Sequence, residues 1–376
     1  MEPNYLSPAP DGRPLTLEDL RSLRWEEAAQ QAYKRPPFKR PGVAKDFVPV
    51  LATGGLGDAI ISIGVAAEIS RKTGLPARIW SHHPDAVRFI VHSLERAGTV
   101  QKGSVVGETG FEFYGYDYSI RLNCLGIVDI EPHFKGFSNA GLDEIYVANR
   151  RFSATAPWSD LIRFHPSLDN EVARQAEAIG LARASLPFAM LGLEHRPYKL
   201  KITPSFYDWE PYMTVHDGYE VNQPNLHRVT KTWSIRHWEK LVRMVKERHP
   251  EIYVVQLGGT QSRKIPGVDV DLVGRMKIEQ SLQVLARSVV HVDGDSGLVH
   301  AANVLGVPSV AMFGPTPASF FGYRGNANLS PRECGGCWWL KQRWLDHCML
   351  GHRSPKCMDS ILPEDAFAAV ESVLER

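Results

Sequence analysis

Residues 291–320 read HVDGDSGLVHAANVLGVPSVAMFGPTPASF, the most informative stretch of the chain. It predicts a buried strand, a sharp Asp-Ser-Gly turn, a helix, a second buried strand and a Gly-Pro-Thr-Pro loop. A helix that opens directly after a strand turns its unpaired N–H groups toward whatever lies above the sheet. Phosphate suits that position, and open α/β sheets bind ligands at this edge. The stretch therefore predicts both a fold class and an anion site.

The same alternation extends on either side of this stretch. We expect strands at 47–53, 77–83, 212–218 and 252–259, and helices at 59–74, 170–184, 233–250 and 278–289. Residues 111–123 suggest β-rich structure, and the Pro-Glu-Asp start at 363–365 suits a final helix. Strands that alternate with helices indicate parallel sheets covered on both faces.

The length of 376 residues favours two domains. We predict an N-terminal extension at 1–45 with one helix at Thr16–Tyr33, an acceptor-side Rossmann-like domain at 46–205 and a donor-binding Rossmann-like domain at 206–376. The proline-bearing stretch at 196–211 contains the expected linker. The two doubly wound domains would face each other across a cleft.

Composition excludes several classes of protein. Hydrophobic residues make up 43% and charged residues 23% of the chain, and the net charge of +1 gives no general attraction to nucleic acid. No apolar run is long enough for a membrane span, and the first residues lack the order of a secretory signal. A cytoplasmic location is therefore expected.

A glycine-rich turn, Gly54-Gly55-Leu56-Gly57-Asp58, separates the first expected strand from its helix. It lacks the third glycine of a dinucleotide fingerprint, and no Gly-Lys-Ser/Thr follows as in a P-loop. Two interpretations remain. Asp58 either only caps the helix, or it is a general base in the cleft beside the close-approach glycines Gly55 and Gly57.

The turn at Asp295-Ser296-Gly297 and the following His300 form the candidate donor half. Gly297 permits close approach of a ligand, and Ser296 either caps the helix or holds a phosphate oxygen. Lys231 precedes another helix and could neutralise a diphosphate. Backbone groups at the end of a further strand could also meet the ligand, at Gly258 and Gly259.

These motifs together resemble glycosyltransferase family 9, the heptosyltransferases. The resemblance rests on GGLGD, on Lys-x-Trp at 231–233 and on D-S-G-x-x-H-A-A-x-x-L-G-x-P from residue 295. It covers residues 48–75 and 212–318. The family implies a GT-B fold and inverting transfer of a heptose from an ADP-activated donor.

Carried over by motif, the resemblance makes Asp58 the catalytic base and Lys231 the diphosphate-balancing lysine. It makes Met276 the residue whose backbone meets the adenine. The donor-binding motif would be Asp295, Ser296, Gly297 and His300. A base for the acceptor hydroxyl and positive charge for the departing diphosphate are what inverting transfer needs, so no catalytic divalent metal is expected.

Four cysteines cluster near the C-terminus, at Cys334, Cys337, Cys348 and Cys357. Such thiolates can close a tetrahedral zinc or iron site, which would be a structural metal loop at 331–358; four unconnected thiols are the alternative. The cluster resembles the bacterial autotransporter heptosyltransferase branch, whose members hold iron by cysteines and modify adhesin serines. That branch makes a protein serine the favoured acceptor.

Two alternatives accompany this prediction. One is a lipopolysaccharide core heptosyltransferase, and the other is a module that binds or assembles around a nucleotide sugar without catalysis. The expected partners are an ADP-sugar donor and a protein or lipopolysaccharide acceptor, with no nucleic acid. Self-association into a homo-oligomer is left open.

Overall fold

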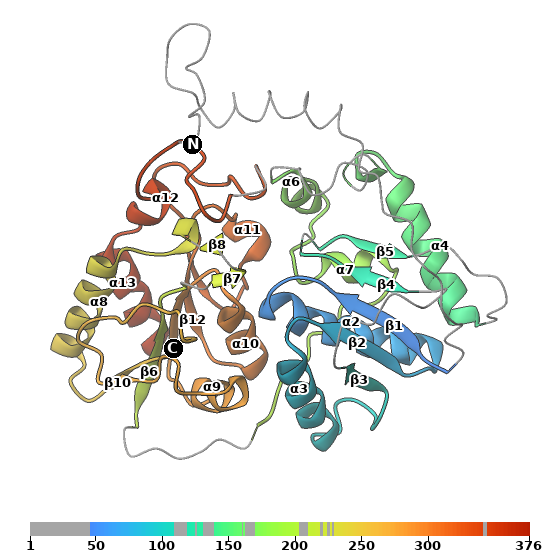
Figure 1. The fold of residues 1–376 in the computed structure, drawn as a ribbon, viewed down its shortest axis with the longest axis horizontal. Helices are drawn as coiled ribbons and strands as arrows, with labels where there is room; N and C mark the ends of the chain where they lie inside the picture. The colour runs from blue at the N-terminus through green and yellow to red at the C-terminus, as the bar shows by residue number, and fades with distance from the viewer. Residues whose placement is uncertain are drawn as a thin grey trace, which may run out of the picture.

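The computed structural model describes residues 46–108, 119–124, 126–130, 139–159, 161, 170–202, 210–218, 221–223, 226–227, 229–340 and 344–376. The predicted N-terminal extension and most of the β-rich stretch predicted at 111–123 lie outside these ranges. The described part forms two α/β halves that lie side by side (Figure 1).

The first half is built on a five-stranded sheet in the order β3-β2-β1-β4-β5. Its strands run parallel except for the antiparallel pair of β4 with β5. The strands are β1 (Val48–Ala52), β2 (Ala77–Ser81), β3 (Val105–Glu108), β4 (Ile120–Leu122) and β5 (Val128–Ile130). The helices are α2 (Leu56–Thr73), α3 (Pro84–Arg96), α4 (Ala140–Ala154), α6 (Glu171–Ala178) and α7 (Leu186–Met190).

The second half contains a six-stranded sheet in the order β10-β9-β6-β11-β12-β13, and all its pairs are parallel. Its strands are β6 (Tyr212–His216), β9 (Tyr253–Gln256), β10 (Val270–Asp271), β11 (His291–Gly294), β12 (Ser309–Met312) and β13 (Ala327–Leu329). A separate antiparallel pair joins β7 (Val221–Gln223) and β8 (Leu226–His227).

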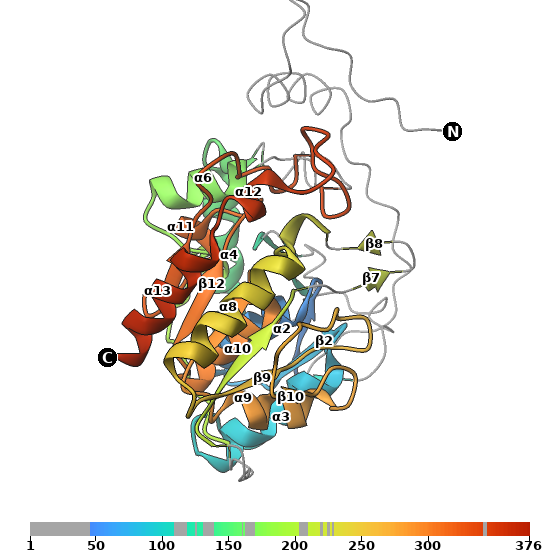
Figure 2. The ribbon, with the colours of Figure 1, turned by 90° about the vertical axis from the view of Figure 1, so that its left-hand side faces the viewer.

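Helices cover this second sheet as well. They are α8 (Ile235–Arg248), α9 (Ile278–Leu285), α10 (Gly297–Leu305), α11 (Ala318–Phe321), α12 (Lys356–Asp359) and α13 (Pro363–Leu374), with a 3-10 turn, η1, at Val229–Lys231. Helices α8 and α13 lie together on the outer side of the sheet (Figure 2). The final helix α13 confirms the expectation from its Pro-Glu-Asp start.

Both sheets follow the Rossmann strand order, in which the first strand lies between the second and the fourth. In the first sheet that reversal falls between β1 and β4, and in the second it falls between β6 and β11. Open α/β sheets bind ligands at this switch point, outside the carboxyl ends of the strands. The predicted α/β class is confirmed, and the two switch points tell where a ligand should bind.

The closest contact between the two halves is made by the helices α2 and α10, whose N-terminal ends meet (Figure 1). Glycines make this approach possible. A Cβ on Gly297 would lie 2.6 Å from the Cβ of Leu56, and one on Gly57 would lie 2.3 Å from the Cδ2 of His300. Further along, Leu200 N–H donates to Val304 O at 2.7 Å.

None of the helices in the described ranges combines the length and the apolar composition that a membrane span requires.

Candidate active site

A cavity of about 770 Å3 opens between the two halves, at the carboxyl ends of their central strands. This volume falls in the range of small-molecule sites. The cavity brings together every residue that the sequence predicted for the acceptor-side loop, the base and the donor site. These are Gly55, Gly57, Asp58, Lys231, Gly258, Gly259, Met276, Asp295, Ser296, Gly297 and His300.

Asp58 occupies the first turn of α2, and both of its carboxylate oxygens accept hydrogen bonds. Oδ2 accepts from Gly55 N–H at 2.9 Å, which closes a capping interaction at the helix start. Oδ1 accepts from the Nη2 of Arg183 in an ion pair. Gly54 has a φ of +130°, and a Cβ there would lie 2.2 Å from Oδ2, so only glycine fits beside this carboxylate. Asp58 thus both caps the helix and faces the cavity.

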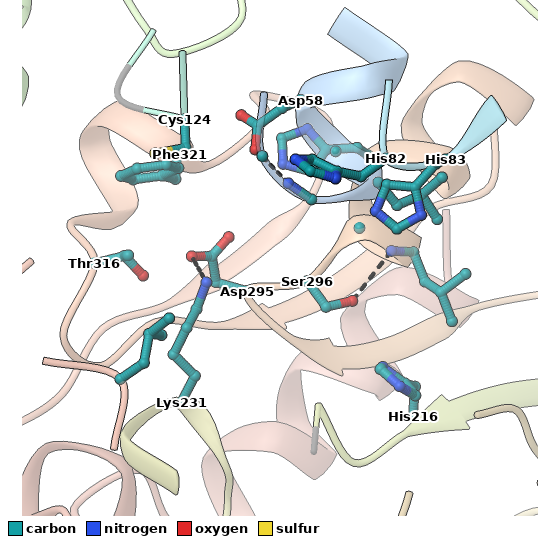
Figure 3. A pocket seen from close by; sticks show the side chains of 18 of the residues that line it. Asp58, His82, His83, Cys124, His216, Lys231, Asp295, Ser296, Thr316 and Phe321 are labelled. Carbon is teal, nitrogen blue, oxygen red and sulfur yellow. Dashed lines mark hydrogen bonds and ion pairs between the residues drawn. The ribbon is translucent and has the colours of Figure 1, made fainter. Parts of the chain in front are cut away.

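Ser296 is the N-cap of α10, as the plainer interpretation of the sequence predicted. Its Oγ accepts from Leu298 N–H at 3.1 Å (Figure 3) and donates to the buried carboxylate of Asp293. The helix therefore begins at the cavity, and its first N–H groups carry partial positive charge there. An anion at this position would be stabilised.

Lys231 forms an ion pair with Asp295, with 2.6 Å between Nζ and Oδ2 (Figure 3). Burial disfavours ionisation of Asp295, but the neighbouring Lys231 outweighs it and holds the pKa of this carboxyl below its ordinary value. Thr316 also contributes in the same direction. The Lys231 ammonium is thus held in place at the cavity wall by a charged partner.

His300 projects from the first turn of α10 toward α2. Burial lowers the pKa of His300, opposed by the carboxylates of Asp295 and Asp58. Its Nδ1 lies 2.6 Å from the hydroxyl oxygen of Tyr323. A histidine with a lowered pKa is neutral at neutral pH, so it offers shape and hydrogen bonding rather than charge.

Sequence reasoning missed several residues of the cavity. Arg183 carries no local signal, because its partner Asp58 lies 125 residues away in the sequence. His216 could have been noticed, since it is the last residue of the buried strand β6; its Nδ1 lies 3.0 Å from each oxygen of Asp293. Trp338 and Trp344 are buried and also line the cavity.

The cysteine loop, residues 331–358, carries both of these tryptophans and the four clustered cysteines. Cys337 and Cys357 are buried, Cys348 is half-buried and Cys334 is exposed. Burial, followed by the charges of Cys334 and Cys348, raises the pKa of the Cys357 thiol to about 12. Within the described residues, however, no three His, Cys, Asp or Glu side chains are arranged to hold one metal ion. The predicted metal site is therefore not formed by this arrangement of thiols.

Two Rossmann-like halves with a cavity between their carboxyl edges make up the GT-B architecture of glycosyltransferases, as predicted. Residues 171–336 match the model of glycosyltransferase family 9 (heptosyltransferase). The resemblance seen in the sequence motifs is thereby confirmed.

Solved structures agree on the fold. The iron-containing dodecameric glycosyltransferase TibC from enterotoxigenic E. coli H10407 has a TM-score of 0.57 and 14% identity, over 90% of this chain and 80% of that one. TibC in complex with ADP-D-beta-D-heptose gives the same TM-score and identity, over 92% and 81%. No curated protein matches the sequence.

Proposed function

We propose that this protein transfers a heptose from an ADP-heptose-type donor to an acceptor hydroxyl, with inversion at the anomeric carbon. The observation that carries the proposal is the cavity in which Asp58 from α2 faces Lys231 and the N-terminus of α10. A base from one half and an anion site from the other are the two requirements of such a transfer.

In this proposal Asp58 accepts the proton of the acceptor hydroxyl. The hydroxyl oxygen then bonds to the anomeric carbon while the bond from that carbon to the diphosphate oxygen breaks. The electron pair leaves with ADP, whose added negative charge is stabilised by Lys231 and by the first N–H groups of α10. Gly258, Gly259 and Met276 would contact the nucleotide from the opposite wall.

The base assignment is tested with Asp58→Asn, which preserves the shape and the acceptor for Gly55 N–H. Loss of a general base should lower kcat about 100-fold to 10,000-fold. The measurement is heptosyl transfer from ADP-heptose, followed by mass spectrometry of the acceptor. Asp85→Asn is the matched control, because Asp85 lies in the first turn of the next helix, α3, outside the cavity. Equal activity of Asp58→Asn and wild type would refute the assignment.

For the acceptor, we propose a serine hydroxyl of a protein. Support comes from the cysteine-bearing loop, through which the sequence resembles the autotransporter branch, and from the common fold with TibC. The competing acceptor is a lipopolysaccharide core, and competition between a serine-rich adhesin fragment and a lipid A-bearing acceptor separates the two. ADP-heptose binding without transfer to either would favour the non-catalytic module.

We also propose that the cysteine loop takes up a structural iron or zinc. The residue types suit both metals, and TibC is described as iron-containing, although the four thiols would have to move closer together. Elemental analysis of the purified full chain should find one metal that is lost in Cys337→Ser but kept in Cys124→Ser. Absence of metal from the wild type would refute this proposal.

TibC is also described as dodecameric. We propose that this chain self-associates, which sedimentation of the purified protein would detect.

A further inference from the structure

Among the buried polar atoms of the cavity wall, two nitrogen donors have no protein partner in the described part of the chain. One is the indole Nε1 of Trp344, whose residue is 4% exposed, and the other is the guanidinium Nη1 of Arg183, whose residue is 3% exposed. A buried donor without a hydrogen bond destabilises the folded chain, so its presence in a native structure requires an explanation.

Trp344 is fixed next to the predicted diphosphate site. Its carbonyl accepts from the Oγ1 of Thr230 at 2.9 Å, and the carbonyl of Leu345 accepts from Thr230 N–H at 3.1 Å. The Lys231 Nζ lies 6.0 Å from the centre of the Trp344 ring. The cysteine loop is therefore attached to the turn that carries Lys231, and it holds the indole beside that ammonium.

Arg183 occupies the other side of the cavity. Its Nη2 bonds to Asp58, which leaves Nη1 without a partner among the described residues. In the proposed reaction the transferred sugar must lie between the base and the diphosphate, because its anomeric carbon is bonded first to the diphosphate oxygen and then to the acceptor oxygen that Asp58 deprotonates. Arg183 and Trp344 thus stand at the two ends of the space that the sugar has to occupy.

The remaining wall is aromatic. Trp338 and Phe321 pack edge to face with ring centres 4.9 Å apart, and Trp339 lies 6.2 Å from Trp344. All of them line the cavity. A sugar has apolar C–H faces and hydroxyl oxygens around its rim, so it matches an aromatic wall that carries isolated donors.

We propose that Trp344 Nε1–H and Arg183 Nη1–H donate hydrogen bonds to hydroxyl oxygens of the transferred sugar, which makes the cysteine loop a sugar-recognition element. This assignment rests on the proposed function. It predicts that the two donors strengthen the binding of ADP-heptose but not of ADP, because ADP lacks the sugar hydroxyls that would accept their hydrogen bonds.

The test is calorimetric titration of the full chain with ADP and with ADP-heptose. Trp344→Phe should weaken ADP-heptose binding about fivefold, the value of one neutral hydrogen bond, and leave ADP binding unchanged. Trp238→Phe is the matched control: Trp238 also has a buried Nε1 without a partner in the described residues, but it lies on α8 outside the cavity. It should change neither affinity.

Arg183→Lys provides an independent variant that keeps a positive charge for Asp58 but lacks the second nitrogen. It too should weaken ADP-heptose binding selectively, whereas Arg88→Lys on the exposed face of α3 should not. Unchanged ADP-heptose affinity in Trp344→Phe and Arg183→Lys would overturn the assignment, as would equal losses for both ligands. If the wild type binds neither ligand, the proposed function fails and this assignment fails with it.

Discussion

Asp293 is a fully buried carboxylate directly beneath the predicted donor site. Burial opposes its ionisation, but His216 and His291 outweigh that effect and lower the pKa of Asp293 to about 2. Its oxygens bind the His216 Nδ1 and the Ser296 hydroxyl. The carboxylate therefore connects the end of β6 to the start of α10 and helps to position both at the cavity.

This lowered pKa makes a prediction about stability and pH. Because the folded pKa of about 2 lies below the ordinary 3.8, the stabilisation from Asp293 is complete above pH 4 and is lost as pH falls toward 2. The shift corresponds to about 2 kcal/mol. Urea unfolding from pH 6 to pH 2 should show that Asp293→Asn is less stable than wild type, with a difference that shrinks by that amount on acidification.

Asp143→Asn is the control, since Asp143 is an exposed carboxylate in the first turn of α4. Its difference from wild type should change much less over the same pH range. A constant difference between wild type and Asp293→Asn would show that Asp293 is not held ionised by its neighbours.

Among single residues, the sequence predicted the site residues that belong to short, recognisable motifs. Asp58 and Ser296 belong to turns whose chemistry can be recognised from a few neighbouring residues. Arg183 and Trp344 are placed at the site by contacts with residues far away in the sequence, Asp58 and Thr230 respectively. Nothing in their immediate neighbourhood encodes that contact, so local reasoning could not assign them to the site.

Among the elements, the facing N-termini of α2 and α10 depend most on single residues. Gly57→Ala should favour the helix by propensity alone, yet its Cβ would come 2.3 Å from the His300 ring. We therefore expect a net loss of about 1–3 kcal/mol in unfolding free energy and reduced heptosyl transfer. Chemical denaturation and the transfer assay measure the two effects.

The control for this prediction is Gly325→Ala, because Gly325 has no atom within 4 Å of an added Cβ. It should leave both stability and transfer close to wild type. A Gly57→Ala protein with raised stability and full activity would mean that the two helix ends do not need this close approach.

The boundaries of the elements show where periodicity succeeds and where it fails. The helix predicted at 59–74 is α2, which ends at Thr73 with Gly74 as its left-handed cap. The helix expected at 170–184 is instead the short α6, because Gly180 adopts a φ of +75° soon after its end. Helices α3 and α4 were not predicted. Polar residues interrupt the apolar pattern of α4 in particular, and packing against α2 and α7 stabilises it.

For the whole molecule, the arrangement of the apolar core is more informative than the division of the sequence. One cluster of buried residues contains Ile60 and Ile90 from the first half together with Leu285 and Ala301 from the second. A second cluster, with Val370, lies between the six-stranded sheet and its outer helices. The alternation of strands and helices predicted two Rossmann-like units, but it could not predict that they share a core. The boundary between residues 205 and 206 stays a prediction.

A shared core has a consequence for unfolding. Two domains with separate cores usually unfold in separate steps, whereas here the loss of either half would expose apolar surface of the other.

Val370→Ala, deep in the second half, should lower the free energy of unfolding by about 2 kcal/mol. It should reduce hydrogen-exchange protection by the same free energy in β12 of its own half and in β1 of the other. Ile79→Val in β2 is the reciprocal variant, and it should affect β12 as well as β1. Loss of protection confined to the mutated half would show that the halves unfold independently, and that the contact of α2 with α10 is a weak interface rather than part of one core.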